Sequence, residues 1–202
     1  MMLDRRTQIV DAAARVIAQH GFTQTSVDDV IRTSGLSGKS HFYHYFASKE
    51  ALGFEVLNRQ FEHFADSLLA ILRGPSGDPF ERLNRFIDAI VAAQAARGCA
   101  GGCPFGSLAS ELADEHEGFR LRIESIFNRW AEQLQSLLWE ARPRLRDDVD
   151  TARMARFIIA TLEGAVLMSR VQRDVAALEG IAEDLKRFVM MHVPEGTRRF
   201  ES

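Results

Sequence analysis

Apolar residues recur at intervals of three and four along almost the whole chain, and this spacing is the feature that most limits the possible folds. The first run with this spacing contains Ile9, Ala13, Val16 and Ile17. Such a period places apolar side chains on one face of an α-helix. No segment shows the alternation of apolar and polar residues that is typical of a half-buried strand. The sequence therefore predicts an all-α protein.

Glycine, proline and capping residues divide the chain into about nine predicted helices. Gly21 and Gly35 are expected to end the first two. Either Thr25 or Ser26 is expected to cap the second, Ser37 a third that runs to about residue 45, and Ser48 a long fourth helix that reaches the breaker at 74–79. The later helices are expected at 80–97, 107–116, 118–141, 150–173 and 177–192, and a Gly-rich loop is expected at 97–106.

The break at Ser48 separates three short helices from longer ones, and it predicts two domains, 1–48 and 49–202. Residues 1–50 contain six Lys or Arg and five Asp or Glu, so they carry +1 of a net charge of −3, and the remainder carries −4. A polyanion is therefore expected to meet the N-terminal domain.

The N-terminal residues MMLDRRTQIVDAAARVIAQHG are not expected to be a signal peptide, because charged residues interrupt every apolar stretch. No apolar run approaches the roughly 18–20 residues that a membrane span needs. These observations predict a cytoplasmic protein that does not associate with a membrane.

The stretch SGLSGKSHFYHYFASK, residues 34–49, contains two Lys, two His and no acidic residue. Short helices on either side of a tight turn at Gly35 form a helix-turn-helix unit, whose second helix fits the major groove of DNA. We expect Phe42 and Phe46 to be buried against the first two helices. The side chains expected to face phosphates and base edges are Lys39, Ser40, His41, Tyr43 and His44, with Lys49 as a further phosphate contact at the start of the next helix. Carboxylates would repel the DNA backbone, which accounts for their absence.

The run GFTQTSVDDVIRTSGLSGKSHFYHYFASKEAL, residues 21–52, resembles the DNA-binding head of the TetR family of transcriptional regulators. The matching features are a glycine–aromatic end of the first helix, Thr25-Ser26-Val27 opening the second, Gly35 in the turn, and the segment YHYF followed by SKE. The predicted DNA-binding residues are then Thr25, Ser26, Ser37, Lys39, Ser40, His41, Tyr43, His44 and Lys49. This chain is one residue longer than most members between Gly35 and Phe46, which leaves open whether Lys39, Ser40 or His41 reaches a base.

The resemblance implies a sequence-specific regulator. Repression is favoured, with release from the double-stranded operator by a small apolar or reactive molecule, and activation stays open as the alternative. The resemblance also implies a homodimer formed through the last two helices, at about 150–173 and 177–192, and no cofactor. The apolar residues within 154–171 leave a surface too broad for a simple exposed helix. An ordinary buried helix in a monomer is the alternative.

Aromatic residues in the C-terminal domain are candidates for lining the inducer pocket, because such sites are mostly apolar. The candidates are Phe64, Phe86, Phe105, Phe127 and Trp130. Their helical spacing is equally compatible with core packing.

Cys103 is a candidate sensor of oxidants or electrophiles. Pro104 suits the first position of a helix, and Cys103 would then lie at its N-terminus, where the helix dipole favours a thiolate. The segment GCPFGSLASELADE, residues 102–115, is similar to that of a TetR-family branch with a redox-active cysteine. Cys99 would be the resolving partner. The alternative is that both thiols are inert loop residues.

The sequence lacks the residues that metal binding or enzymatic catalysis would need. His41 and His44 have no third ligand nearby, so no metal site is expected. We find no Gly-rich phosphate loop, no HExxH and no nucleophile signature, so no enzyme is expected. A thiol peroxidase or reductase built on Cys99 and Cys103 would need strands, and the motif and charge of the head disfavour a helical ligand carrier without DNA function.

Overall fold

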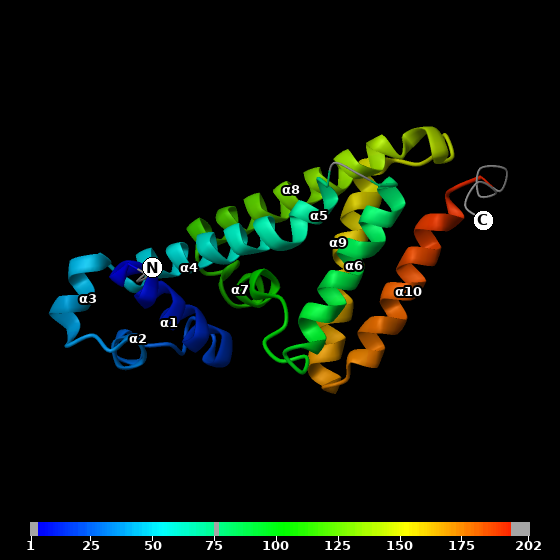
Figure 1. Ribbon diagram of the computed structural model, residues 1–202. Coiled ribbons are helices and arrows are strands. Elements are labelled where there is room, and N and C mark those ends of the chain that lie inside the picture. The colour runs from blue at the N-terminus through cyan, green and yellow to red at the C-terminus, as the bar shows by residue number, and fades with distance from the viewer. Residues whose placement is uncertain (1–3, 75–76, 195–202) are drawn as a thin grey trace. The chain divides into compact units, whose positions relative to one another are not determined.

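The computed structural model describes residues 4–74 and 77–194, which form helices joined by turns and loops (Figure 1). The helices are α1 (Arg5–His20), α2 (Val27–Ser34), α3 (Lys39–Tyr45), α4 (Lys49–Phe64), α5 (Ala70–Leu72), α6 (Pro79–Ala95), α7 (Pro104–Leu112), α8 (Glu117–Glu140), α9 (Thr151–Gln172) and α10 (Val175–Met191). A π-helical turn, Ala65–Leu69, joins α4 to α5, and a short 3-10 helix, Arg142–Arg144, follows α8. The described residues therefore form nine helices if α4, the π-helical turn and α5 are taken as one and the 3-10 helix is not counted. Within the described ranges no residue is in a strand. The predicted all-α fold class is confirmed.

Two of the predicted helix caps are present and one is wrong. Ser26 accepts from the backbone N–H of Asp29 at the start of α2, and Ser48 accepts from that of Ala51 at the start of α4. Gly38, not Ser37, is the residue before α3. Because α3 begins one residue later than predicted, the hydroxyl of Ser37 caps no backbone amide and instead lies 3.3 Å from His41 Nδ1.

Two other helices differ from their predicted course. The long fourth helix is interrupted by the π-helical turn Ala65–Leu69, where the pattern of backbone hydrogen bonds widens. Helix α7 begins at Pro104, as expected from the suitability of proline for the first helical position, and not at 107 as its apolar spacing indicates. Residues 75–76 of the predicted breaker at 74–79 lie outside the described residues.

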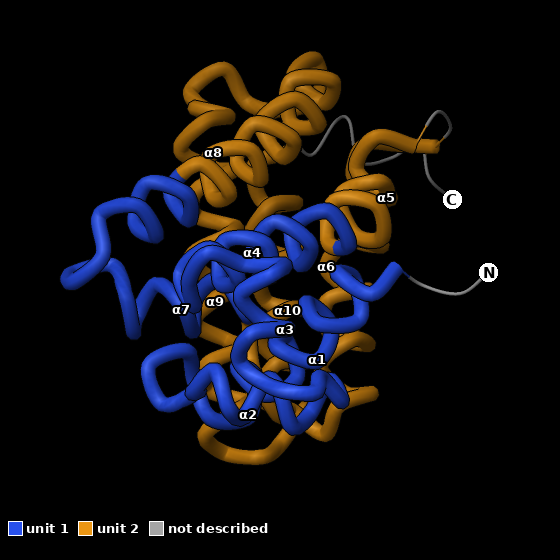
Figure 2. Tube along the Cα trace, turned by 90° about the vertical axis from the view of Figure 1, so that its left-hand side faces the viewer, with its two compact units in different colours: residues 1–63, 104–124 blue, residues 64–103, 125–202 orange. Residues whose placement is uncertain are grey.

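The chain divides into two compact units (Figure 2): Met1–His63 with Pro104–Glu124, and Phe64–Cys103 with Ser125–Ser202. The first unit holds α1–α3, α4 up to His63, α7 and the beginning of α8. This unit is therefore larger than the predicted N-terminal domain, 1–48, because it also contains parts of the predicted C-terminal domain. The boundary at residue 48 stays a prediction.

Three phenylalanines and one glycine form the centre of the first unit. The ring of Phe119 lies 4.3 Å from that of Phe54, stacked on it, and 5.1 Å from that of Phe22. A Cβ atom at Gly53 would lie 2.5 Å from the Phe22 ring and 2.8 Å from the Phe119 ring. Glycine at 53 therefore lets α4 approach the two rings closely.

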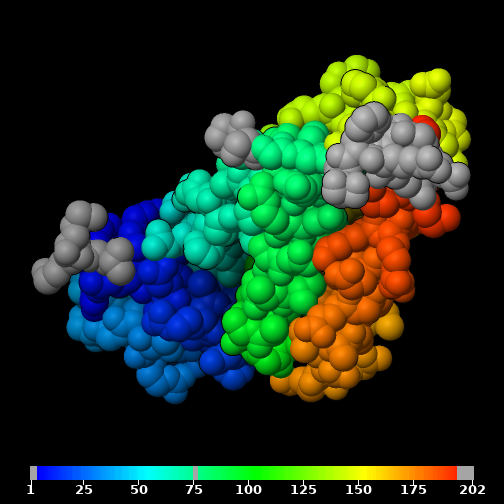
Figure 3. Space-filling model, turned by 45° about the vertical axis from the view of Figure 1, so that its right-hand side comes forward, coloured from blue at the N-terminus to red at the C-terminus, as the bar shows by residue number. Residues whose placement is uncertain are grey.

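The second unit packs around α6, α9 and α10, and α6 and α10 lie side by side on the face shown in Figure 3. Arg82 of α6 is a buried cation whose guanidinium connects three segments. Its Nη1 donates to the carbonyl oxygens of Leu72 at 3.1 Å and Gly74 at 3.0 Å, and its Nη2 pairs with Glu140 of α8. The interactions of this arginine hold the end of α5 against α6 and α8.

Among the helices of the described residues, none combines the length and the apolar character that a membrane crossing requires.

Candidate nucleic-acid interface

The start of α2 is set by a reciprocal pair of hydrogen bonds. Ser26 Oγ accepts from Asp29 N at 3.1 Å, and Asp29 Oδ2 accepts from Ser26 N at 2.9 Å. Two backbone N–H groups at the helix end are thereby satisfied. Ser26 remains exposed, whereas Thr25 is 1% exposed and its hydroxyl donates to Gly21 O at 2.6 Å. The Thr25 side chain therefore belongs to the interior of the head.

The turn between α2 and α3 depends on Gly35, whose φ of +65° lies in the left-handed region. Phe42 and Phe46 are buried as predicted, with their rings 5.8 Å apart. The two side chains fix α3 against the rest of the head, and they turn the opposite face of α3 outward.

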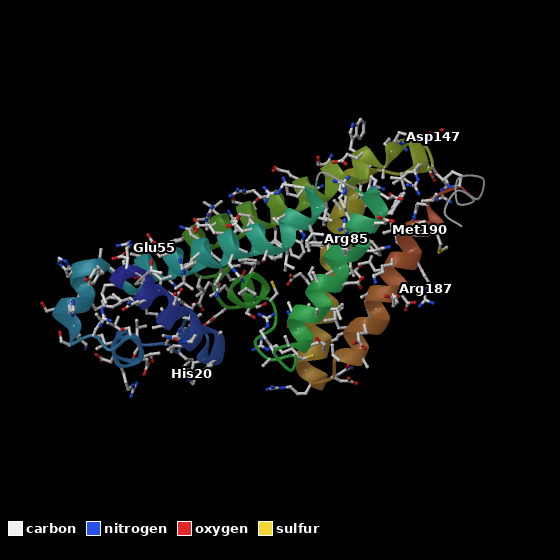
Figure 4. The ribbon with its side chains drawn as sticks, in the orientation of Figure 1. His20, Glu55, Arg85, Asp147, Arg187 and Met190 are labelled. Carbon is white, nitrogen blue, oxygen red and sulfur yellow. The ribbon has the colours of Figure 1, made fainter. Side chains whose placement is uncertain are left out.

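Arginines of α1 hold the turn and the end of α3. Arg5 Nη2 donates to Gly35 O at 2.8 Å. Arg6 Nη1 donates to Tyr45 O at 2.8 Å, and its guanidinium carbon lies 4.6 Å from the Phe46 ring centroid. Its Nη2 pairs at 2.9 Å with Glu55 of α4, which is labelled in Figure 4. Sequence reasoning missed both residues, because the partners are 30 to 49 positions away.

The outward face of α3 carries most of the predicted contacts. Lys39, Ser40, Tyr43 and His44 are exposed, and Tyr43 keeps 53% of its surface accessible. Ser37 is also exposed. His41 is half-buried, with its ring 5.6 Å from that of Tyr45. Donor groups are therefore displayed along one short helix whose other face is locked into the core.

An acidic residue lies next to this face despite the acid-free sequence. Lys39 Nζ lies 3.1 Å from Asp28 Oδ2 of α2, and both side chains are more than half exposed. The ion pair is exposed and therefore weak, so a phosphate can compete for the lysine. Sequence position gave no signal for it, since Asp28 precedes the acid-free stretch.

Lys49 faces the head itself. Its Nζ donates to Thr23 O at 3.2 Å and lies 4.6 Å from the centroid of the Phe22 ring. The ammonium thus contacts the loop between α1 and α2, and its predicted contact with a phosphate would require it to leave these partners.

The same loop is held from the other side by Glu111 of α7. The carboxylate accepts from Phe22 N at 2.8 Å and also from Thr23 N. Burial by itself would raise the pKa of Glu111, but the N–H groups of Thr23 and Phe22 lower it more, and the pKa lies below its ordinary value of 4.5. A charged group of the first unit outside the predicted head therefore stabilises the end of α1.

Four of the five aromatic pocket candidates come together in the second unit. The Trp130 ring lies 5.1 Å from that of Phe64 and 6.2 Å from those of Phe86 and Phe127. Phe86 and Trp130 are buried, and Phe64 and Phe127 are half-buried. Phe105 is buried in the first unit, where its ring lies 6.2 Å from that of Phe61.

Both cysteines belong to the second unit, and neither is part of a disulfide. Cys99 is 2% exposed and has a left-handed backbone with φ of +58°, and Cys103 is half-buried directly before α7. Burial raises the pKa of Glu163 on α9, and a hydrogen bond with Cys103 partly offsets that rise. No group of three or more His, Cys, Asp or Glu able to hold a metal ion occurs in the part of the chain that the structure describes.

Helices α9 and α10 expose a set of large apolar side chains. Phe157 of α9 and Phe188 of α10 contact each other, with ring centroids 4.8 Å apart. The exposed fractions are 43% for Phe157, 59% for Leu167, 48% for Met168, 76% for Val171, 36% for Phe188 and 65% for Met191. A Cβ atom at Gly164 would meet no atom within 4 Å. These two helices therefore present an apolar surface to solvent in the single chain.

Two family models match the chain. Residues 9–56 match the model described as "Bacterial regulatory proteins, tetR family", and residues 79–185 match "Tetracyclin repressor-like, C-terminal domain". The first match contains α2, α3 and the turn between them, and the second contains α6 to α9.

Similar proteins extend over most of the chain. The HTH-type transcriptional repressor DhaR of Mycobacterium sp. (strain GP1) is 27% identical, over 86% of this chain and 86% of that protein. A crystal structure of the reduced form of NemR from E. coli has a TM-score of 0.83 at 24% identity and covers 92% of this chain and 96% of that one. A TetR transcriptional regulator from Chloroflexus aurantiacus has a TM-score of 0.83 at 26% identity, over 94% and 96%.

Proposed function

The chain belongs to the TetR family of transcriptional regulators, and from this membership we propose that it binds operator DNA in the cytoplasm as a homodimeric repressor until a small molecule releases it. The observation that carries the proposal is the exposed donor face of α3, which Phe42 and Phe46 fix from behind. The relatives DhaR and NemR are both named as repressors, which supports repression rather than activation.

In this proposal α3 enters the major groove. Lys39, Ser40 and His44 are the residues that approach base edges and phosphates, and the exposed Tyr43 places its hydroxyl on the DNA backbone. The exposed hydroxyls of Ser26 and Ser37 contact flanking phosphates, and the half-buried His41 supports α3 beside Tyr45. Thr25 and Lys49 keep their internal partners and stabilise the head.

Two heads reach DNA together because α9 and α10 pair with the same helices of a second copy. The exposed apolar side chains of these helices, from Phe157 to Met191, would be buried in that contact. A two-fold dimer reads a palindromic operator whose half-sites are about 34 Å apart, or a multiple of that distance.

The inducer is a small, largely apolar molecule bound in the second unit around Phe64, Phe86, Phe127 and Trp130. Its binding must favour the arrangement that releases DNA, and such coupling is typically about 1–3 kcal/mol. Phe105, which packs on Phe61 in the first unit, is a core residue in this proposal.

A second route to release is oxidation at Cys103. Peroxide would convert its thiolate to a sulfenic acid, and attack by the Cys99 thiol would release water and form a disulfide. The E. coli relative NemR has been solved in a reduced form. Cys103 shares a hydrogen bond with the carboxyl group of Glu163, and a thiol that donates its proton to that group is held as the thiol rather than the thiolate, so inert thiols are the competing explanation. Operator release by peroxide in the wild type but not in Cys103→Ser supports the sensor, and equal behaviour of the two proteins refutes it.

The DNA interface is tested with an operator selected from randomised duplexes. The double variant Ser40→Ala/His44→Ala should bind the selected duplex at least tenfold more weakly, since each lost base contact costs about 1–3 kcal/mol. His63→Ala, which removes an exposed histidine of α4, is the matched control. Wild-type affinity in the double variant would contradict the assignment of α3 as the reading helix.

A further inference from the structure

Trp130 of α8 is 2% exposed, and its indole N–H has no hydrogen-bond partner among the described residues. An indole nitrogen is a donor only, and a buried tryptophan N–H usually finds an acceptor. A buried donor left without a partner costs about 1–3 kcal/mol. Such an atom in an otherwise apolar place marks a position where an acceptor from another molecule would be favourable.

The surroundings of Trp130 are aromatic. Phe64 meets the indole edge-to-face at 5.1 Å, Phe86 edge-to-face at 6.2 Å, and Phe127 stacks at 6.2 Å with an interplanar angle of 17°. All four residues belong to the second unit. Flat, apolar ligands are bound well by such surfaces, because aromatic rings prefer stacked or edge-to-face neighbours.

One side of this aromatic cluster borders an irregular stretch of helix. The π-helical turn Ala65–Leu69 begins immediately after Phe64, and π-helical turns occur frequently at functional sites. Phe64 and Phe127 are the two half-exposed rings of the cluster, whereas Phe86 is fully buried. A ligand would therefore reach the indole by displacing these two rings, beside the segment where the helix is least regular.

We propose that the N–H of Trp130 donates a hydrogen bond to a carbonyl or ether oxygen of a flat, uncharged, mostly apolar ligand held between Phe64, Phe86 and Phe127. The proposal rests on the proposed function in that it names the chemical class of the inducer, but it concerns a binding event that can be measured without DNA. The expected charge follows from the same contacts: the unpartnered N–H is neutral and the three rings packed on the indole are hydrocarbon, so they offer no counter-charge to a charged ligand. A pure hydrocarbon would leave the indole N–H unpaired.

The chain supplies its own matched control. Its two tryptophans lie on the same helix, and Trp139 is 66% exposed. Trp130→Phe removes the N–H and keeps an aromatic ring, and Trp139→Phe makes the same change in solvent. The probes are 1-indanone and indane, which share a bicyclic frame and differ in one ketone oxygen. Affinities are measured by titration calorimetry on the full chain, and quenching of fluorescence in Trp139→Phe, where Trp130 is the only tryptophan, locates the ligand.

We expect 1-indanone to quench Trp130 and to bind Trp130→Phe about three- to tenfold more weakly than Trp139→Phe or the wild type, the value of one hydrogen bond. Indane should bind all three proteins equally. Equal 1-indanone affinity in the two variants would overturn the proposal, and so would no binding of 1-indanone to the wild type.

Binding to the selected operator without ligand is measured on the same preparations. All three proteins should bind the operator alike, because Trp130 belongs to the second unit whereas α1–α3, the proposed DNA-binding helices, belong to the first. If the wild type selected and bound no duplex, the proposed function would be refuted. The comparison of 1-indanone affinity between the two tryptophan variants would still decide the ligand class.

Discussion

Replacing Glu111 tests whether α7 stabilises the DNA-binding head. The carboxylate accepts from the backbone N–H groups of Phe22 and Thr23 at the end of α1, 88 to 89 positions away in the chain. A hydrogen bond to a charged group contributes about 1.5–3 kcal/mol. Phe22 is buried but Thr23 is exposed, so water can replace the carboxylate at only one of the two amides. We therefore expect Glu111→Ala to lower the free energy of unfolding by about 2 kcal/mol, and Glu111→Gln by about half of that.

The effect should also depend on pH with a definite sign. The pKa of Glu111 is lowered from its ordinary value of 4.5 in the folded protein. A group with a lowered pKa contributes stability above the unfolded pKa and loses it as the pH falls through the folded pKa. The stability difference between the wild type and Glu111→Gln should therefore be full at pH 7 and shrink below about pH 4.5.

Urea unfolding at one fixed protein concentration measures this difference, because the stability of a dimer depends on concentration. Glu115→Ala, which removes an exposed carboxylate just after α7, is the control and should leave the midpoint unchanged. A loss in Glu111→Ala no larger than in this control would refute the reasoning, as would a difference that stays constant down to pH 3.

Three further predictions follow from single contacts. Arg82→Lys should lower the free energy of unfolding in urea by about 2–3 kcal/mol, since a single ammonium nitrogen cannot take the places of both Nη1, on two carbonyl groups, and Nη2, on a carboxylate. Asp28→Ala should tighten operator binding at low salt by freeing its partner, and Lys39→Ala should weaken it and lower the salt slope by about one. Leu167→Glu combined with Val171→Glu should shift the protein toward monomers in sedimentation experiments, because two charges would be buried in the proposed dimer contact.

Each of these has a control of the same chemistry. Arg85→Lys changes an exposed arginine of α6 (Figure 4), Asp4→Ala removes an acid far from Lys39 in the sequence, and Leu121→Glu charges an exposed leucine of α8. A control that changes the measured quantity as much as its test variant does would show that the effect does not arise from the named contact.

Features that depend on neighbours in the chain were predictable from the sequence. The apolar spacing predicted the helices, Gly35 predicted the end of α2, and Phe42 and Phe46 were expected in the core. Where local prediction failed, the cause was also local: α3 begins one residue after the position that a Ser37 cap would require, and a π-helical turn interrupts the long helix after Phe64. The first difference is a shift of one residue and the second is a change in the hydrogen bonds of about one turn, and the apolar spacing of the sequence resolves neither.

Contacts between distant segments were decided only by the tertiary structure. The sequence places no acid near Lys39, yet folding brings Asp28 within 3.1 Å of it, and Lys49 turns toward Thr23 rather than away from the head. Spacing likewise could not separate Trp130, whose buried N–H lacks an acceptor among the described residues, from Phe105, which packs on Phe61. Helical period states which face of a helix is apolar, but the partner of each side chain depends on how the helices pack, and that is determined by the whole chain.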